Sequence, residues 1–284
     1  MKSNNSDKQK ITGFFGFFDI LGFKEIIAKN GLEYLCDIIG PILDTLDNEA
    51  VTMGGVDPSQ DLCIHPTSTF VFSDTIILYE KVPQLPNGHI HNFGPTLIEK
   101  AAILTRLAFE KGVPLRGAIS FGEYIVTDRY FFGKPILEAY MAEKKCSWSG
   151  VIFCDSVVEK MQQQPPTQIV NWRGIENIRV RSHPFNQELI VSDHRIPDGR
   201  NRRNPALRWD DILRFRQIVP GLEHLNSTTD VAIIQKRVVD AFSQHNKSID
   251  EKNIEIKIKN TTDFLIHCGG IPIKELRLQY TPPS

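Results

Sequence analysis

The 284-residue sequence predicts an α+β fold, on three observations. Two runs rich in aromatic and β-branched residues, FFDILGF and FVFSDTIIL, have the composition of buried strands. Apolar residues recur at helical spacing in the stretches that follow them. The expected order is strand, helix, strand, strand, helix, strand, helix, strand. Such an order, with a hairpin between two helices, is typical of a sheet with helices packed on it.

The first strand is expected at 12–20. Gly22 and Phe23 then turn the chain into a helix, because apolar residues recur at helical spacing from Leu32 to Leu46. A hairpin is expected at 69–79, with Ser73-Asp74 at its tip. The remaining expected elements are a helix at 96–111, a strand at 115–121, a helix at 136–145, a strand at 151–154 and a helix from about 155.

The sequence QQQPP after Met161 marks a break in this pattern. Beyond it we expect short strands at 188–191 and 254–258 and an amphipathic helix at 228–245. The predicted organisation is therefore a disordered segment at 1–11, one domain at 12–162, and a C-terminal elaboration at 163–284 that packs on this domain.

Composition excludes several classes of function. The formal net charge of -1 gives no general positive field, so no nucleic-acid partner is expected. No apolar run has the ~20 residues that cross a bilayer, and the polar start MKSNNSDKQK is unlike a signal peptide. The five cysteines show no CxxC pair and no zinc-site spacing. We therefore expect a cytoplasmic protein with reduced cysteines and no membrane partner.

Asp19 and Asp74 each interrupt an apolar run, where an unpaired charge would be costly. A divalent metal would relieve both costs if the fold placed their strands side by side. Two carboxylates on adjacent strands could bridge two ions ~3.5–4 Å apart, an arrangement used for phosphoryl transfer. Magnesium or manganese is expected because hard cations prefer oxygen ligands, and the carbonyl of Ile20 could add one more.

Simpler roles for the two acids remain open at this point. Asp19 could cap the helix that follows it, and Asp74 could stabilise a tight turn. Each role is common for an isolated aspartate at such a place. Both acids have unusually apolar flanks, however, and a shared metal explains the pair.

Four segments, FFDILGF, FSDTIIL, PLRGAISFGE and FGKPILEAYMAEKK, occur in the order and approximate spacing of class III nucleotidyl cyclases. Over about 12–160 the chain most resembles the bacterial pyrimidine cyclases of the Pycsar anti-phage defence system. This resemblance implies a ferredoxin-like catalytic core that forms a head-to-tail homodimer with shared active sites. It also implies two Mn²⁺ or Mg²⁺ ions, held by Asp19, Asp74 and the carbonyl of Ile20.

The resemblance further implies the roles of the substrate-binding residues. The backbone amides of Leu21, Gly22 and Phe23 would meet the phosphates. Purine-specific cyclases read the base with a lysine and an aspartate, at positions that are Phe70 and Tyr130 here. Because neither side chain can reproduce those contacts, we expect UTP or CTP as substrate and cyclic UMP or CMP as product. The product would act through a separate cyclic-nucleotide-responsive effector.

Two family residues that stabilise the transition state, an asparagine and an arginine, are replaced by Leu137 and Met141. The transferring phosphate still needs donors. Arg116 is the first candidate, since it lies in a predicted strand, and the others are Arg129, Lys134, Lys144 and Lys145. Two alternatives stay open: a cyclase-fold nucleotide-binding regulator without catalysis, and an ATP or GTP cyclase with unusual base contacts.

Overall fold

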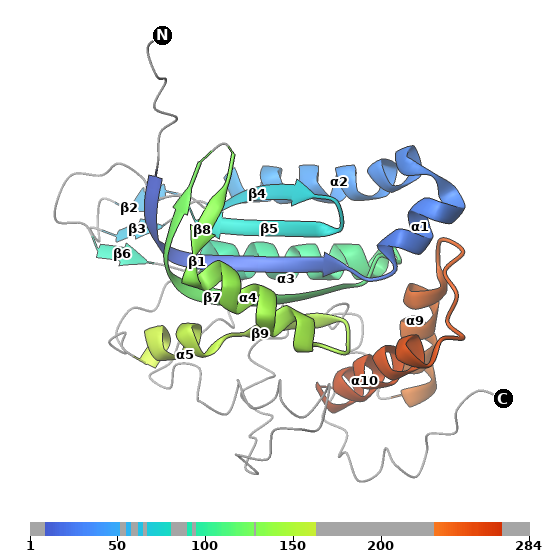
Figure 1. The fold of residues 1–284 in the computed structure, drawn as a ribbon. Helices are drawn as coiled ribbons and strands as arrows, with labels where there is room; N and C mark the ends of the chain where they lie inside the picture. The colour runs from blue at the N-terminus through green and yellow to red at the C-terminus, as the bar shows by residue number, and fades with distance from the viewer. Residues whose placement is uncertain are drawn as a thin grey trace.

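The computed structural model describes residues 9–51, 55–57, 62–64, 67–80, 90–92, 95–127, 129–162 and 230–268. Its main sheet has the strand order β4-β5-β1-β7-β8, and β9 pairs with β7 (Figure 1). These strands are β1 (Gln9–Ile20), β4 (Thr67–Phe72), β5 (Thr75–Glu80), β7 (Leu115–Val126), β8 (Phe131–Gly133) and β9 (Gly150–Phe153). A smaller sheet contains β2 (Gly55–Asp57), β3 (Leu62–Ile64) and β6 (Ile90–Asn92).

The central part of the main sheet has ferredoxin-like topology. Strand β1 lies between β5 and β7 and is antiparallel to both, and β4 pairs antiparallel with β5. Helices separate β1 from β4 and β5 from β7 along the chain. This is the β-α-β-β-α-β pattern, so the predicted α+β fold class is confirmed.

Helices cover both faces of the main sheet. Figure 1 shows α2 and α3 behind it, α4 and α5 in front, and α9 and α10 beyond the end at which β1 stops. The helices are α1 (Phe23–Asn30), α2 (Leu32–Val51), α3 (Pro95–Glu110), α4 (Lys134–Lys145), α5 (Asp155–Gln162), α9 (Val231–Ser243) and α10 (Lys252–Cys268). Within the described residues, no helix is long and apolar enough to cross a membrane.

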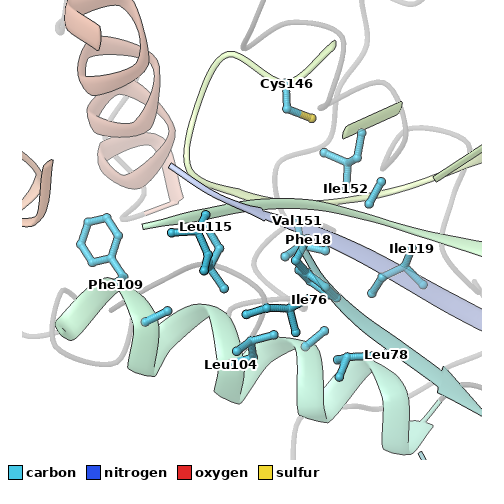
Figure 2. Packing of buried hydrophobic residues seen from close by; sticks show 14 of the residues in the cluster. Phe18, Ile76, Leu78, Leu104, Phe109, Leu115, Ile119, Cys146, Val151 and Ile152 are labelled. Carbon is cyan, nitrogen blue, oxygen red and sulfur yellow. The ribbon is translucent and has the colours of Figure 1, made fainter. Parts of the chain in front are cut away.

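The core between the sheet and α3 fixes which way Asp19 faces. Phe18 and Leu115 from the sheet and Leu104 from α3 are completely buried, and Figure 2 shows them gathered between these layers. Successive side chains of a strand point to opposite faces, so Asp19 faces away from this core. Its neighbour two residues earlier, Phe17, meets the ring of Tyr140 on α4 at 5.6 Å. Asp19 therefore lies on the α4 side of the sheet.

The predicted strand at 254–258 is wrong, because these residues lie in helix α10. The alternation of Ile254, Ile256 and Ile258 suggested a strand, but Ile256 is exposed and Ile258 is buried. The buried face continues at Thr261 and Leu265, three and seven residues after Ile258. That spacing is helical, and packing of this face overrides the short alternating pattern.

Other boundaries differ by a few residues. Strand β1 begins at Gln9, so the end of the segment predicted as disordered belongs to the sheet. Strand β7 continues to Val126, and Gly31 divides the first predicted helix into α1 and α2. The helix predicted at 228–245 is found as α9. The strand predicted at 188–191 lies outside the described residues.

Candidate functional site

The structure brings the two aspartates together at the end of β1. The predicted hairpin is present as β4 and β5, with Ser73 and Asp74 in its turn. Asp19 lies opposite Thr75 in the β1–β5 ladder, and the amide of Ile20 donates to the carbonyl of Asp74 at 2.9 Å. The backbone of Asp74 therefore lies beside Asp19 and Ile20 in space, although the two aspartates are far apart in the sequence.

The carboxylate of Asp19 faces Arg116, which lies directly opposite it on β7. Arg116 Nη2 and Nε lie 3.0 Å and 3.1 Å from Asp19 Oδ2. The same guanidinium donates from Nη1 to the carbonyl of Cys146 at 3.2 Å. Residues directly opposite on antiparallel strands share a face and interact, so the ladder register creates this pair. Asp19 does not cap α1, whose N-cap is Gly22.

Glu143 of α4 completes the charged cluster from the other side of Arg116. Its carboxylate is fully buried, 2.5 Å from Arg116 Nε and 3.8 Å from Lys144 Nζ. Neither Glu143 oxygen has a hydrogen-bond partner among the described residues, so the contact with Arg116 is an ion pair. Burial raises the pKa of the Glu143 carboxyl, and the positive charge of Arg116 opposes this rise.

The carboxylate of Asp74, unlike that of Asp19, has no charged partner among the described residues. It makes no hydrogen bond or ion pair within the described part of the chain, and Asp74 is partly exposed. Only its backbone is engaged, through the amide of Ile20. The tight turn therefore does not depend on the Asp74 side chain, and this carboxylate is available to a ligand.

The loop after β1 turns sharply into α1. Gly22 has a φ of 82°, in the left-handed region, and a Cβ there would lie 2.6 Å from Cδ of Lys247. The amides of Gly22 and Phe23 have no hydrogen-bond partner among the described residues, as expected at the start of a helix. The amide of Leu21, by contrast, donates to the carbonyl of Pro114 at 2.9 Å.

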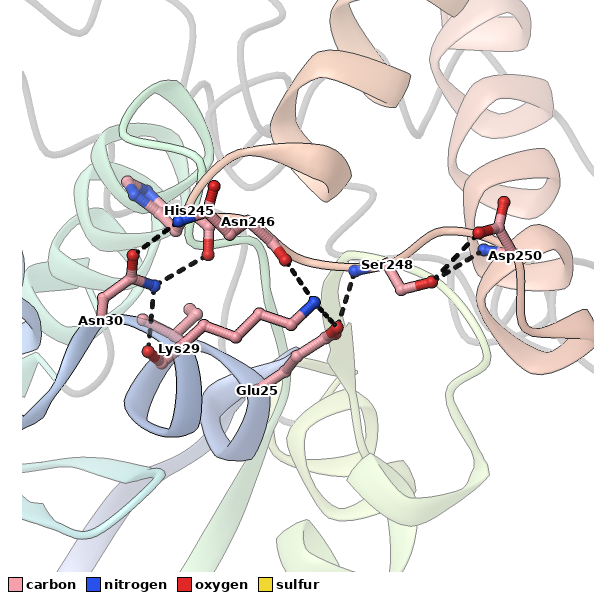
Figure 3. Close-up of polar contacts among 8 residues, drawn as sticks. Glu25, Lys29, Asn30, His245, Asn246, Ser248 and Asp250 are labelled. Carbon is pink, nitrogen blue, oxygen red and sulfur yellow. Dashed lines mark hydrogen bonds and ion pairs between the residues drawn. The ribbon is translucent and has the colours of Figure 1, made fainter.

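The turn between α9 and α10 makes hydrogen bonds to α1, the helix that follows this loop (Figure 3). Glu25 of α1 accepts from the amide of Ser248 at 2.8 Å, and Lys29 donates to the carbonyl of Asn246 at 2.6 Å. Asn30 donates to the carbonyl of His245 at 2.9 Å. We call this set of contacts between α1 and residues 245–248 the α1 clasp. It fixes α1 to the C-terminal helices.

Lys247 extends the clasp into the interior. Its buried ammonium donates to the carbonyls of Gly112 and Ala241, at 2.7 Å and 3.1 Å. Burial lowers the pKa of Lys247 to about 8, and the negative charge of Glu25 opposes this shift. The Lys247 side chain thus joins the α1 loop, the turn after α3 and the end of α9.

The depressed pKa of Lys247 predicts a pH-dependent stability. Between pH 8 and its ordinary value of 10.5 the unfolded chain binds more protons than the folded protein, so stability rises with pH in this window. The gain in the free energy of unfolding between pH 7.5 and 9.5 is about 2 kcal/mol.

Urea unfolding of the wild type and Lys247→Met at both pH values should show this gain in the wild type alone. Lys236→Met, on the exposed side of α9, is the control. Equal pH dependence in the wild type and Lys247→Met would contradict the assignment.

Each of the two residues expected to contact the base lies against another aromatic ring. Phe70 on β4 meets the ring of Phe131 at 5.3 Å, and Tyr130 stacks on Phe132 at 4.8 Å. The amide of Tyr130 donates to Thr127 Oγ1 at 3.1 Å, which holds the turn before β8. Phe131 and Phe132 are consecutive on β8 and therefore point to opposite faces of the strand, so Phe70 and Tyr130 belong to separate aromatic pairs, and both remain partly exposed.

The positions of the two missing family residues are exposed on α4. Leu137 and Met141 lie one helical turn apart, with Tyr140 beside them. Of the other candidate donors, Lys144 lies 5.4 Å from the centre of the Tyr140 ring. Arg129, Lys134 and Lys145 are exposed. Arg116 is thus the candidate donor that directly contacts a proposed metal ligand.

The donor atoms at the end of β1 fit a magnesium or manganese ion. The set contains the carboxylate of Asp74, the carboxylate of Asp19 and the carbonyl of Ile20, all oxygen donors. Within the described residues no three His, Cys, Asp or Glu side chains gather into a metal site. Two carboxylates suffice for magnesium when substrate phosphates and water complete its shell. The pairing of Asp19 Oδ2 with Arg116 leaves Oδ1 without a described partner.

Sequence reasoning missed two charged residues of this cluster, Glu143 and Lys257. Glu143 follows Pro135 and Ala139 on the buried face of α4, at intervals of four residues. That spacing could have revealed a carboxylate facing the core. Lys257 lies in the segment predicted as a strand at 254–258, for which the sequence indicates no helical face. The pKa of Lys257 is lowered by burial and by the positive charge of Arg116, whereas Asp19 and Glu143 raise it.

Comparison with known proteins found distant structural likenesses alone. No protein-family model matches the chain, and no curated protein matches it. One similar structure is the catalytic core of a rhodopsin-guanylyl cyclase with converted specificity in complex with ATPαS: TM-score 0.35, 12% identity, covering 59% of this chain and 92% of the other. Another is the adenylyl cyclase CyaB from P. aeruginosa: TM-score 0.36, 14% identity, covering 60% and 91%. Such distant likenesses carry no assignment of function, which therefore depends on this chain's own site.

Proposed function

We propose that this protein is a metal-dependent nucleotide cyclase that converts UTP or CTP into the 3′,5′-cyclic monophosphate and pyrophosphate. The observation that carries the proposal is the meeting of Asp19, Ile20 and Asp74 at the end of β1, next to the loop with the unbonded amides of Gly22 and Phe23. Oxygen ligands for a divalent cation and amide donors for phosphate thus lie next to each other at the end of β1. A nucleoside triphosphate with its metal ions needs both kinds of group.

Each residue has a distinct proposed role. Asp19, Asp74 and the carbonyl of Ile20 hold two Mn²⁺ or Mg²⁺ ions, which would activate the ribose 3′-hydroxyl and neutralise the triphosphate. Gly22 and Phe23 donate their amides to phosphate oxygens. Arg116 orients Asp19 and donates to the transferring phosphate, because a guanidinium has five N–H donors and its described contacts do not use them all.

The pyrimidine specificity rests on Phe70 and Tyr130. Both present aromatic surface, and Phe70 has no group that could pair with the edge of a purine. Aromatic rings stack on any base, and neither side chain reproduces the lysine or aspartate contact expected of a purine-specific site. We further propose that the cyclic product serves as a second messenger in anti-phage defence, through a separate effector that responds to cyclic nucleotides.

A homodimer with shared active sites is also proposed. Exposed apolar side chains occur on α4, where Leu137 is 59% and Met141 52% exposed, and on β8, where Phe132 is 63% exposed. An exposed apolar patch of this kind favours an interface. A second protomer on this face could supply the transition-state donors whose places Leu137 and Met141 occupy. Sedimentation of the wild type and Leu137→Glu tests this, and a wild-type monomer would contradict it.

The proposed activity is tested by incubating the purified protein with each of the four nucleoside triphosphates and Mn²⁺. We expect pyrophosphate and a cyclic monophosphate from UTP or CTP, separated by chromatography. Products from ATP or GTP alone would refute the pyrimidine specificity. Thermal stabilisation by nucleotide without any product would favour the alternative, a regulator that binds nucleotide without catalysis. The replacement of the family's asparagine and arginine is the observation that motivates this alternative.

A further inference from the structure

Lys257 is a half-buried lysine whose ammonium has no hydrogen bond and no ion pair within the described part of the chain. Most buried lysines have partners, because an uncompensated ammonium away from water is costly. Lys247, by comparison, donates to two backbone carbonyls. Lys257 is therefore a half-buried cation that neighbouring charges influence but that has no direct hydrogen-bond or ion-pair partner among the described residues.

Helix α10 faces the site through fixed contacts. Thr261 is completely buried, and its Oγ1 accepts from the amide of Ser149 at 2.9 Å. Asn260 donates to the carbonyl of Ser147 at 2.9 Å. Residues 147–149 join α4 to β9, where Gly150 lies opposite Arg116 of β7. The helix is thus anchored to the segment that runs beside the Asp19–Arg116 pair.

Lys257 lies one turn before Thr261 on the same side of α10, and helical side chains lean toward the N-terminus of their helix. Its charge is repelled by Arg116 and attracted by Asp19, Glu251 and Glu143. The ammonium thus extends from the anchored face of α10 toward the charged end of β1.

We propose that Lys257 binds the phosphate chain of the substrate, so that the C-terminal helices complete the nucleotide site. This inference rests on the proposed function and deepens it. The ammonium of Lys257 would donate charge-assisted hydrogen bonds to phosphate oxygens. These oxygens would be the partner that the ammonium lacks among the described residues. The α1 clasp and Lys257 would then secure opposite sides of the same site, one holding the loop with Gly22 and the other the phosphates.

Binding without turnover tests the proposal. The probes are 3′-deoxy-UTP, which has no hydroxyl to cyclise, and inorganic tripolyphosphate, each titrated with Mg²⁺ in a calorimeter. We expect Lys257→Met to weaken both about 10- to 100-fold, as a charge-assisted hydrogen bond implies. Lys257→Arg should retain most of the affinity. Lys259→Met should bind as the wild type does, because Lys259 is on the exposed side of α10 and pairs with Asp263.

The outcomes separate this inference from the proposed function. If the wild type binds neither probe, both fail. Equal binding by the wild type and Lys257→Met overturns the role of Lys257 alone and leaves the cyclase site intact. Wild-type binding of tripolyphosphate but not of 3′-deoxy-UTP excludes UTP as the substrate, and weaker tripolyphosphate binding by Lys257→Met then still supports the role of Lys257. Lower stability of Lys257→Met to urea with unchanged affinity would assign Lys257 a structural role and overturn the proposal.

Discussion

Asp74→Asn is expected to lower the rate of cyclisation at least about 1000-fold while leaving stability nearly unchanged. A metal ligand contributes several kcal/mol to a phosphoryl-transfer transition state, and each 1.36 kcal/mol is a factor of ten. Stability should survive because the Asp74 carboxylate has no described partner and only its backbone carbonyl bonds to Ile20. Asparagine also tolerates turn conformations. The measurements are pyrophosphate release with Mn²⁺ and urea unfolding.

Asp37→Asn provides the control for this prediction. Asp37 is exposed on α2, so this substitution makes the same chemical change on a helix that contributes no residue to the proposed site. Its activity and stability should both equal those of the wild type. Turnover by Asp74→Asn within tenfold of the wild type would refute the two-metal site. A large loss of stability would mean that Asp74 supports the turn.

Arg116→Met is expected to cost about 3–5 kcal/mol of folding free energy. Breaking a buried ion pair by removing one partner leaves an uncompensated charge. Here the carboxylate left behind is that of Glu143, which is fully buried, and Asp19 loses its partner too. Urea unfolding of purified Arg116→Met at pH 7 measures the loss.

The double variant Arg116→Met/Glu143→Gln identifies the cause. Removing both charges should recover a large part of the loss, since the buried carboxylate is gone. Simple additivity of the two single variants would contradict the coupling. The pH dependence gives a second check on Arg116→Met. Without Arg116 the pKa of Glu143 rises further, so the folded state binds the extra proton and the deficit should be smaller at pH 5 than at pH 8.

Much of the fold was predictable because its signals are local. The strand around Asp19, the hairpin around Asp74 and the helices α3 and α4 each have their own apolar periodicity, and all are present. The strand predicted at 254–258 failed because a short alternating run fits either element. Only the packing of Ile258, Thr261 and Leu265 on the rest of the protein decides for a helix.

The sequence alone indicated two carboxylates with apolar flanks, of which Asp19 lies in a strand and pairs with Arg116, whereas Asp74 lies in the hairpin turn. It identified Asp19, Asp74 and Arg116, since each residue type and its flanks are visible in the chain. The tertiary structure decided which groups meet. The register of β1 with β5 and β7 sets Asp19 beside Asp74 and opposite Arg116. Contacts between residues remote in sequence depend on that register and on packing, which no local pattern records. For this reason Glu143 and Lys257 emerged only from the folded protein.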